Sequence, residues 1–394
     1  SDVYKRQVLE HLASSLISNQ AEILEANEVD LARGLANGMA QGLQDRLRLT
    51  PERLSSLSKS VLEIIALADP IGEVVAGKTL PNGLKISQVR VPFGVVGMIY
   101  EARPNVTIDI AALCIKSGNA ALLRGGSAAE QTNRVLVNLI QSSLAAAGLP
   151  PECVQSVDEF GRDGAIALMQ ARGQVDVLIP RGSANLIKTV VEESKVPVIE
   201  TGDGIVHIFV DASADLDAAR PIILNAKVQR PSVCNSLETL LVHEAVAQKL
   251  LPTLNSDLAR SGVKVHACEK SLPLMPGSEA ATEQDWATEY LALELSVRVV
   301  SDIDEALSHI SKYSTKHTES ILTSDMSNTE RFLNEVDSAV VMVNASTRFT
   351  DGGEFGFGAE VGISTQKLHA RGPMGLSALT STKWLVRGAG QVRS

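Results

Sequence analysis

Apolar residues in the first part of the chain recur at the three- and four-residue spacing that is typical of amphipathic helices. The clearest positions are Leu9, Leu12, Leu16, Leu54, Leu57 and Val61. Thr50 followed by Pro51 predicts a helix start, because threonine caps the first turn and proline fits the first helical position. We expect helices up to Asp69, and we interpret residues 1–7, which lack an initiator methionine, as the end of a fragment.

After Lys85 the pattern changes to short, mostly apolar runs that alternate with longer amphipathic stretches. Such runs, bounded by glycine and proline, predict buried strands of a parallel sheet that are joined by helices. The first set covers residues 94–100, 120–123, 153–157, 175–179 and 196–200. A second set follows Pro231 at residues 238–243, 263–268, 295–300, 320–323 and 340–344, with a last strand at 384–386. The sequence therefore predicts two α/β domains.

Composition excludes several classes of function. The chain has 394 residues, with 36 Lys and Arg against 46 Asp and Glu, and only 3% of its residues are aromatic. A net charge of −10 and so few stacking faces argue against nucleic-acid binding. No uncharged apolar stretch reaches the roughly 18 residues of a transmembrane helix, so we expect no membrane partner. Four cysteines and the lack of a secretory signal favour a reduced, cytoplasmic protein.

Residues 72–79 match the phosphate-loop pattern G-x-x-x-x-G-K-[ST] literally. A phosphate loop leaves a buried strand and starts a helix, whereas this segment follows a predicted helix and precedes Pro81. The adjacent Val74 and Val75 also favour a strand. A nucleotide-binding phosphotransferase is kept as an alternative, for which ATP binding should be lost on Lys78→Ala.

Histidines and glycines do not complete the other common site patterns. His243 begins like a zinc-protease helix, but Ala247 stands where the second imidazole is required, and His266 has no partner pair. We therefore predict no metal site. Residues 356–358 begin a dinucleotide fingerprint, yet Val361 occupies the place of its third glycine.

Cys234 differs from the other cysteines in its surroundings. Those three lie in an apolar helical pattern or beside a glutamate, which disfavours a thiolate: Cys114, Cys153 and Cys268. Cys234 follows two cations, Lys227 and Arg230, in a loop at the junction of the two predicted domains. A cation near the thiol lowers its pKa and prepares it for nucleophilic catalysis. The alternative on local sequence alone is an inert loop thiol.

Five blocks of sequence carry a resemblance to a known family. They are residues 100–105 (YEARPN), 123–127 (LRGGS), 230–235 (RPSVCN), 343–360 and 365–375. In these blocks, and in order from about Val8 to the C-terminus, the chain resembles the gamma-glutamyl phosphate reductase (glutamate-5-semialdehyde dehydrogenase) family of the aldehyde dehydrogenase superfamily. Blocks of this length are highly specific.

The resemblance implies an enzyme that uses NADPH to reduce L-glutamyl 5-phosphate to L-glutamate 5-semialdehyde and phosphate, in L-proline biosynthesis. Cys234 would displace phosphate to form a thioester, which hydride from the nicotinamide then reduces. The Asn105 amide and the backbone N–H of Cys234 would hold the oxyanion. Asn105 also fits a helix N-cap. Glu200 resembles the glutamate that activates water in relatives that hydrolyse their thioester, and its role is left open.

The resemblance also implies an aldehyde dehydrogenase-like α/β fold with two parallel-sheet domains and a small oligomerisation arm. We expect an NADP-binding domain at residues 1–230, a catalytic domain at 231–362 and a C-terminal return and oligomerisation segment at 363–394. The expected partners are a small-molecule substrate and further copies of the chain in a homo-oligomer. Functional coupling to glutamate kinase is also expected.

Seven residues are candidates for holding NADPH. They are Arg124, Gly125, Gly126, Ser127, Gly182, Ser183 and Glu289. Small residues let a phosphate approach the backbone at a helix start, and Arg124 favours the 2′-phosphate of NADPH, although Glu130 lies close in sequence. By resemblance, Glu289 holds the nicotinamide ribose. The alternatives are an ordinary glycine turn and a surface carboxylate.

The anionic substrate requires cations, and four arginines in Gly- or Pro-bounded loops are candidates. They are Arg103, Arg230, Arg348 and Arg371. Residues 313–317 depart from the family pattern, because we expect a glycine in that loop. Two further functions stay open: an aldehyde dehydrogenase that oxidises another small aldehyde, and a non-catalytic binding protein that would tolerate Cys234→Ala.

Overall fold

The N-terminal region is helical, as the apolar spacing predicts. A computed structural model describes residues 1–393 of the chain. Its first four helices are α1 (Asp2–Ser18), α2 (Gln20–Ala36), α3 (Gln41–Leu47) and α4 (Pro51–Ala66). The Thr50 hydroxyl accepts a hydrogen bond from the Arg53 N–H at 3.2 Å, which confirms the predicted cap. The apolar stripes of α1 and α4 are buried.

The chain forms two compact units whose limits differ from those of the predicted segments 1–230, 231–362 and 363–394. Unit 1 comprises residues 1–201, 356–362 and the chain from 373 onward, whereas unit 2 comprises 202–355 and 363–372. The boundary lies earlier than predicted because residues 206–210 form a strand of the second sheet. Residues 216–228 form the helix that follows this strand. The functional roles that we assigned to these segments remain predictions.

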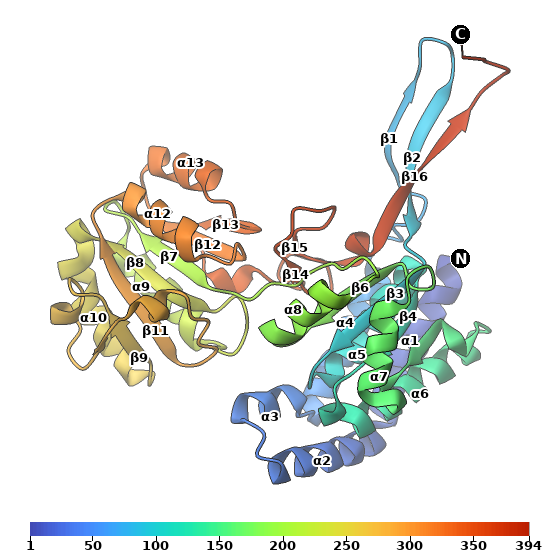
Figure 1. Ribbon diagram of the computed structural model, residues 1–394, viewed down its shortest axis with the longest axis horizontal. Coiled ribbons are helices and arrows are strands. Elements are labelled where there is room, and N and C mark those ends of the chain that lie inside the picture. The colour runs from blue at the N-terminus through green and yellow to red at the C-terminus, as the bar shows by residue number, and fades with distance from the viewer. Residues whose placement is uncertain (394) are drawn as a thin grey trace. The chain divides into compact units, whose positions relative to one another are not determined.

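Unit 1 contains a parallel sheet of four strands in the order β5-β4-β3-β6 (Figure 1). Its strands are β3 (Val95–Tyr100), β4 (Ala120–Arg124), β5 (Val154–Ser156) and β6 (Val177–Arg181). Four more helices belong to this unit: α5 (Pro104–Ser117), α6 (Glu130–Ala146), α7 (Gly161–Gln170) and α8 (Ala184–Glu193). The strand predicted at 196–200 is wrong, because only an isolated bridge joins Val198 to Leu178.

Three antiparallel strands form a separate ribbon in unit 1 that extends away from the helices of that unit (Figure 1). They are β1 (Val74–Thr79), β2 (Lys85–Pro92) and β16 (Thr380–Arg387). The apolar runs predicted the last strand but not β2, and for β1 the sequence offered only the strand preference of Val74 and Val75. These two strands are mostly exposed or half-buried, so they lack the apolar run that marks a buried strand.

Unit 2 is built on a sheet in the order β10-β9-β11-β8-β7-β12-β13, in which all neighbouring strands are parallel. The strands are β7 (Val206–Val210), β8 (Leu237–His243), β9 (Lys264–Ala267), β10 (Glu279–Ala280), β11 (Glu294–Val300), β12 (Thr318–Leu322) and β13 (Val340–Val343). The sequence analysis missed β7, although it is buried throughout and lies between β8 and β12.

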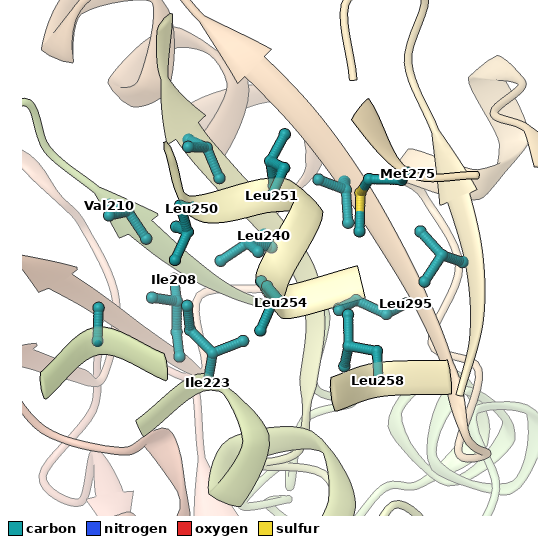
Figure 2. Packing of buried hydrophobic residues seen from close by; sticks show 14 of the residues in the cluster. Ile208, Val210, Ile223, Leu240, Leu250, Leu251, Leu254, Leu258, Met275 and Leu295 are labelled. Atoms are coloured by element: carbon teal, nitrogen blue, oxygen red, sulfur yellow. The ribbon is translucent and has the colours of Figure 1, made fainter. Parts of the chain in front are cut away.

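Helices cover both faces of the second sheet. They are α9 (Leu216–Val228), α10 (Glu244–Arg260), α11 (Glu283–Trp286), α12 (Ile303–Tyr313) and α13 (Met326–Glu335). On one face, Ile223 of α9 and Leu250, Leu251 and Leu254 of α10 pack towards Leu240 of β8 (Figure 2). A second apolar cluster joins α12 and α13 to the other face. The sheet is thus buried on both sides, which explains its continuous apolar strands.

The segment that connects β13 to β16 along the chain is mostly irregular. It contains two short strands, β14 (Ile363–Ser364) and β15 (Gly372–Pro373). Among the residues that the structure describes, no helix is long and apolar enough to cross a membrane.

Candidate active site

Cys234 lies in the loop that joins α9 to β8 and is half-buried. The backbone of Gly204 approaches it so closely that a Cβ on Gly204 would lie 1.5 Å from the carbonyl oxygen of Cys234. Only glycine can therefore occupy position 204 without moving the cysteine loop. None of the four cysteines among the described residues takes part in a disulfide, and Cys114 is buried, which raises its thiol pKa.

Arg348 brings a positive charge to the cysteine loop. Burial and the nearby Arg230 lower the pKa of Arg348, with burial as the larger cause. Asp351 and Cys234 raise this pKa, which shows that the guanidinium and Cys234 interact electrostatically. Its Nε donates to Gln229 Oε1 at 3.0 Å, whereas its Nη1 is buried and has no hydrogen-bond partner within residues 1–393. A buried guanidinium N–H without an acceptor is costly, so this geometry favours an anion at that nitrogen.

Asn235 attaches the Arg348 segment to the cysteine loop. Its Nδ2 donates to the carbonyl oxygen of Thr350 at 2.8 Å and to that of Arg348 at 3.4 Å. Arg348 and Cys234 are therefore held together by the fold of unit 2 itself.

Lys227, the first of the two cations before Cys234, forms an ion pair with Glu238. It is fully buried on α9, and its ammonium donates to Glu238 Oε2 at 2.7 Å. Burial raises the pKa of Glu238 to about 8, and the ammonium offsets part of this rise. The second predicted cation, Arg230, interacts electrostatically with Arg348.

Glu289 lies in the loop between α11 and β11 of the same unit. Its Oε1 accepts a hydrogen bond from the Gly204 N–H at 2.8 Å. The segment around Gly204 thus contacts both the peptide of Cys234 and the Glu289 carboxylate. The half-buried Glu289 carboxylate is therefore held in a defined position relative to the cysteine loop.

Asn105 occupies the first turn of α5 in unit 1. The N-cap position of this helix is Arg103, so the expectation that Asn105 is an N-cap is wrong. The Asn105 Nδ2 donates to Asp109 Oδ2 at 3.1 Å, one turn further along the helix. Burial raises the pKa of Asp109 to about 6, while Asn105 and Arg181 lower it and Glu360 raises it. A perturbed carboxyl group beside a candidate oxyanion donor is typical of active sites.

The turn after β4 packs closely against other residues of unit 1. A Cβ on Gly125 would lie 2.0 Å from Asn133 Nδ2, and one on Gly126 would lie 3.4 Å from the Cα of Glu101. The Gly125 N–H donates to Asp158 Oδ1 at 2.6 Å, and Arg124 Nε donates to the carbonyl of Gly161 at 3.3 Å. Close packing against Asn133 thus requires a glycine at position 125, whereas a Cβ at position 126 would make only an ordinary contact.

Glu130, which left the cofactor preference open, is bound by arginines. Its two carboxylate oxygens lie 3.4 Å from Arg33 Nη1 and 3.7 Å from Arg134 Nη2. Arg33 also donates to the carbonyl oxygen of Ser127 at 2.5 Å. The negative charge of Glu130 is therefore partly balanced at this turn.

The helix start at Gly182 and Ser183 is occupied by a carboxylate of the chain itself. The Ser183 N–H donates to Glu101 Oε2 at 2.9 Å, and its hydroxyl donates to Oε1 at 3.1 Å. A Cβ on Gly182 would lie 2.8 Å from Glu101 Oε2. A helix N-terminus favours negative charge, and here Glu101 provides it. A cofactor phosphate would have to replace this carboxylate.

Arg103 and Glu200 belong to unit 1, whereas Arg371 belongs to unit 2. Arg371 Nη2 lies 2.9 Å from Asp337 Oδ1, which also binds Lys316 and Lys367. Arg103 begins α5, and Glu200 follows the bridge at Val198. Within unit 2, the Arg348 guanidinium interacts electrostatically with both Arg230 and Cys234.

Comparison with known proteins decides the family. Residues 8–272 match the model of the aldehyde dehydrogenase family. Gamma-glutamyl phosphate reductase of Leifsonia xyli subsp. xyli is 65% identical over 100% of this chain and 94% of its own length. The chain belongs to the gamma-glutamyl phosphate reductases of the aldehyde dehydrogenase family. It is an oxidoreductase with an aldehyde dehydrogenase-like fold.

Solved structures agree with this family. The crystal structure of gamma-glutamyl phosphate reductase from Thermotoga maritima has a TM-score of 0.95 and 46% identity, covering 100% of this chain and 95% of that one. An engineered glycolyl-CoA reductase with bound NADP+ shares the fold at a TM-score of 0.72 and 16% identity, covering 98% of this chain and 92% of that one. The family to which the chain belongs uses nicotinamide cofactors.

The literal phosphate-loop match does not have the geometry of such a loop. Residues 74–79 are strand β1, which pairs antiparallel with β2, and no helix begins at Lys78 or Thr79. Within residues 1–393, no group of three or more His, Cys, Asp and Glu side chains could hold a metal ion.

Sequence reasoning about this reductase missed Glu101, Asp109 and Gly204. Glu101 and Gly204 act through neighbours that lie far away in sequence, which no local pattern reveals. Asp109 carried a signal, because it follows Asn105 by one helical turn, where side chains of one face meet.

Proposed function

We propose that the chain reduces L-glutamyl 5-phosphate with NADPH to L-glutamate 5-semialdehyde and phosphate, through a thioester on Cys234, in L-proline biosynthesis. One observation carries the proposal beyond family membership. The Nη1 of Arg348 is buried and has no acceptor among the described residues. The same guanidinium interacts electrostatically with Cys234. An anionic leaving group beside the nucleophile supplies the acceptor that this nitrogen lacks.

Cys234 is the proposed nucleophile. Its thiolate attacks the acyl carbon, a C–S bond forms, and the bond from carbon to the phosphate oxygen breaks with its electron pair leaving on phosphate. Arg348 and Arg230 neutralise the charge of the departing phosphate, because a guanidinium binds phosphate through paired N–H groups. Acyl phosphates are activated, so no glutamate is needed to prepare a water molecule, and we assign Glu200 no step.

The oxyanion of the tetrahedral intermediate needs donors that are already in place. We assign this role to the backbone N–H of Cys234 and to the Asn105 amide. Loss of one such donor costs about a hundredfold to a thousandfold in rate. Asp109 accepts from Asn105 and so fixes the orientation of that amide.

We assign a cofactor phosphate to the β4 turn, where Gly125 has no room for a side chain and Arg124 supplies a cation. Arg124, with the charge of Glu130 balanced by Arg33 and Arg134, favours NADPH. Ser127 extends this turn, Gly182 and Ser183 form the second proposed phosphate contact, and Glu289 would hold the ribose of the nicotinamide. When bound, the cofactor supplies the hydride for the reduction.

The remaining substrate contacts are assigned by charge. Arg103 and Arg371 are proposed to bind the substrate carboxylate, which for Arg371 requires release from Asp337. The proposal also includes a cytoplasmic location, a homo-oligomer and functional coupling to glutamate kinase.

The test is reduction of NADP+ with glutamate semialdehyde, measured with and without inorganic phosphate. The wild type, Cys234→Ser and the control Cys153→Ser are compared, because Cys153 is also half-buried but lies outside the site. We expect a phosphate-dependent rate that the control keeps and Cys234→Ser loses. A rate independent of phosphate would instead favour oxidation of another aldehyde, and a fully active Cys234→Ser enzyme would contradict the thioester.

A further inference from the structure

The loop between α12 and β12 contains a hydroxyl that binds both sides of Gly204. Thr315 Oγ1 donates to the carbonyl oxygen of Asp203 at 2.6 Å and accepts from the N–H of Ile205 at 3.0 Å. One side chain thus fixes the two peptide groups that flank the glycine. All of these residues belong to unit 2, so the geometry is that of a single compact body.

Gly204 is the point where the nucleophile and the proposed ribose-binding residue meet. Its N–H donates to Glu289 Oε1 at 2.8 Å, and its Cα faces the carbonyl oxygen of Cys234 without room for a Cβ. A shift of the Asp203–Ile205 backbone by a few tenths of an ångström would therefore move both the Cys234 peptide and the Glu289 carboxylate.

Thr315 is itself held from the interior of the sheet. The hydroxyl of the preceding Ser314 donates to Glu319 Oε1, and Glu319 Oε2 accepts the backbone N–H of His207 on β7 at 2.8 Å. His207 and Glu319 are fully buried. The loop therefore has a rigid base in the centre of the sheet.

We propose that the Thr315 hydroxyl is a positioning residue that holds the Asp203–Ile205 segment against the Cys234 peptide and the Glu289 carboxylate, and so aligns the nucleophile and the cofactor ribose. This inference rests on the proposed function. In this role Thr315 acts through the Gly204 segment, to which its hydroxyl is bonded on both sides. Residues 313–317, which lack the glycine expected from the family pattern, thus contain this positioning residue.

The test compares Thr315→Val, which keeps the shape but removes the hydroxyl, with Thr315→Ser, which keeps the hydroxyl. Small displacements at a reacting centre cost up to about a hundredfold in rate. We expect Thr315→Val to lower kcat by about 10- to 100-fold and to raise the KM for NADP+, whereas Thr315→Ser stays near the wild type. Thr329→Val is the control, since the Thr329 hydroxyl only bonds the backbone of its own helix, α13.

A Thr315→Val enzyme with wild-type kcat, or a Thr315→Ser enzyme as impaired as Thr315→Val, would overturn the inference. A second readout separates it from the proposed function: the rate at which iodoacetamide alkylates Cys234, followed by peptide mass spectrometry. If phosphate-dependent activity is missing altogether, the proposed function fails. The inference then still requires an altered alkylation rate in Thr315→Val alone, and equal rates in all variants would refute it.

Discussion

Asp109 shows how one half-buried carboxyl group links pH to stability. Its pKa is raised from the usual 3.8 to about 6, chiefly by burial, with Asn105 and Arg181 opposing the rise and Glu360 adding to it. Between these two pKa values the folded chain binds more protons at this site than the unfolded chain does. The free energy of unfolding therefore falls as pH rises from about 4 to about 6.

Asp109→Asn removes this titration. We expect the free energy of unfolding of the variant, relative to the wild type, to increase by about 1 to 3 kcal/mol between pH 4 and pH 7. Chemical denaturation of both proteins at the two pH values measures the difference. An unchanged difference would mean that Asp109 ionises in the folded chain as it does in the unfolded chain.

Some features of the candidate site can be predicted from the sequence, whereas others depend on contacts that only the fold creates. Cys234 and the arginines could be predicted, because long blocks around them carry a family pattern. The carboxylate at Ser183 could not, because Glu101 lies 82 positions earlier and reaches it only through the pairing of β3 with β6. The close approach of Gly204 to Cys234 is likewise set by the neighbouring strands β7 and β8.

At the scale of elements, an ion pair joins helix α9 to strand β8. Lys227 and Glu238 are fully buried, with 2.7 Å between Nζ and Oε2. Removing one partner leaves the other charge buried without compensation, which typically costs about 3 to 5 kcal/mol, whereas replacing both by apolar residues is often nearly neutral.

Lys227→Met should therefore lower the midpoint of thermal unfolding markedly, and adding Glu238→Leu to the same chain should restore most of the loss. Differential scanning calorimetry of the wild type and of both single variants and the double variant gives the comparison. If the double variant is no more stable than Lys227→Met, the cost arises from lost packing and not from an unpaired charge.

Strands were predicted where an apolar run marks them in the sequence. A strand was missed where a buried polar residue depends on a partner that is distant in sequence. The pattern located β3, β4, β8 and β11 within a few residues, because each is an apolar run between turn signals. In β7, His207 interrupts the run, and only its hydrogen bond with Glu319 makes the histidine acceptable in the core. A polar residue whose partner lies 112 positions away conceals a strand from any local pattern.

Loop conformation shows the same limit. The sequence analysis expected a glycine in residues 313–317, and Lys316 in this loop has a φ of +64°, in the left-handed region that favours glycine. Its ammonium lies 3.3 Å from Asp337 Oδ2. The expected backbone conformation is therefore present without the expected residue.

At the scale of the whole molecule, the three-stranded ribbon exposes apolar side chains. Trp384 and Val386 on β16 are 54% and 59% exposed, and residues two apart on a strand lie on the same face. Exposed apolar surface on a ribbon is typical of an association site. This agrees with the proposed homo-oligomer.

We expect Trp384→Lys to lower the molar mass in solution, measured by light scattering after size-exclusion chromatography. Lys383→Ala, on the opposite face of the same strand, serves as the control and should keep the wild-type mass. An unchanged mass in Trp384→Lys, at concentrations where the wild type is oligomeric, would exclude this face as the association site.

The division of the chain between its two units sets an order on folding during synthesis. Unit 1 includes residues at both ends of the chain, and the side chain of Gln88 on β2 bonds Thr382 on β16 across 294 positions. The ribbon therefore stays without one of its three strands until residues 380–387 leave the ribosome. Unit 2 is made from a nearly continuous stretch and can complete its sheet earlier. A chain released before residue 380 would carry β2 with an open edge, which is a template for aggregation.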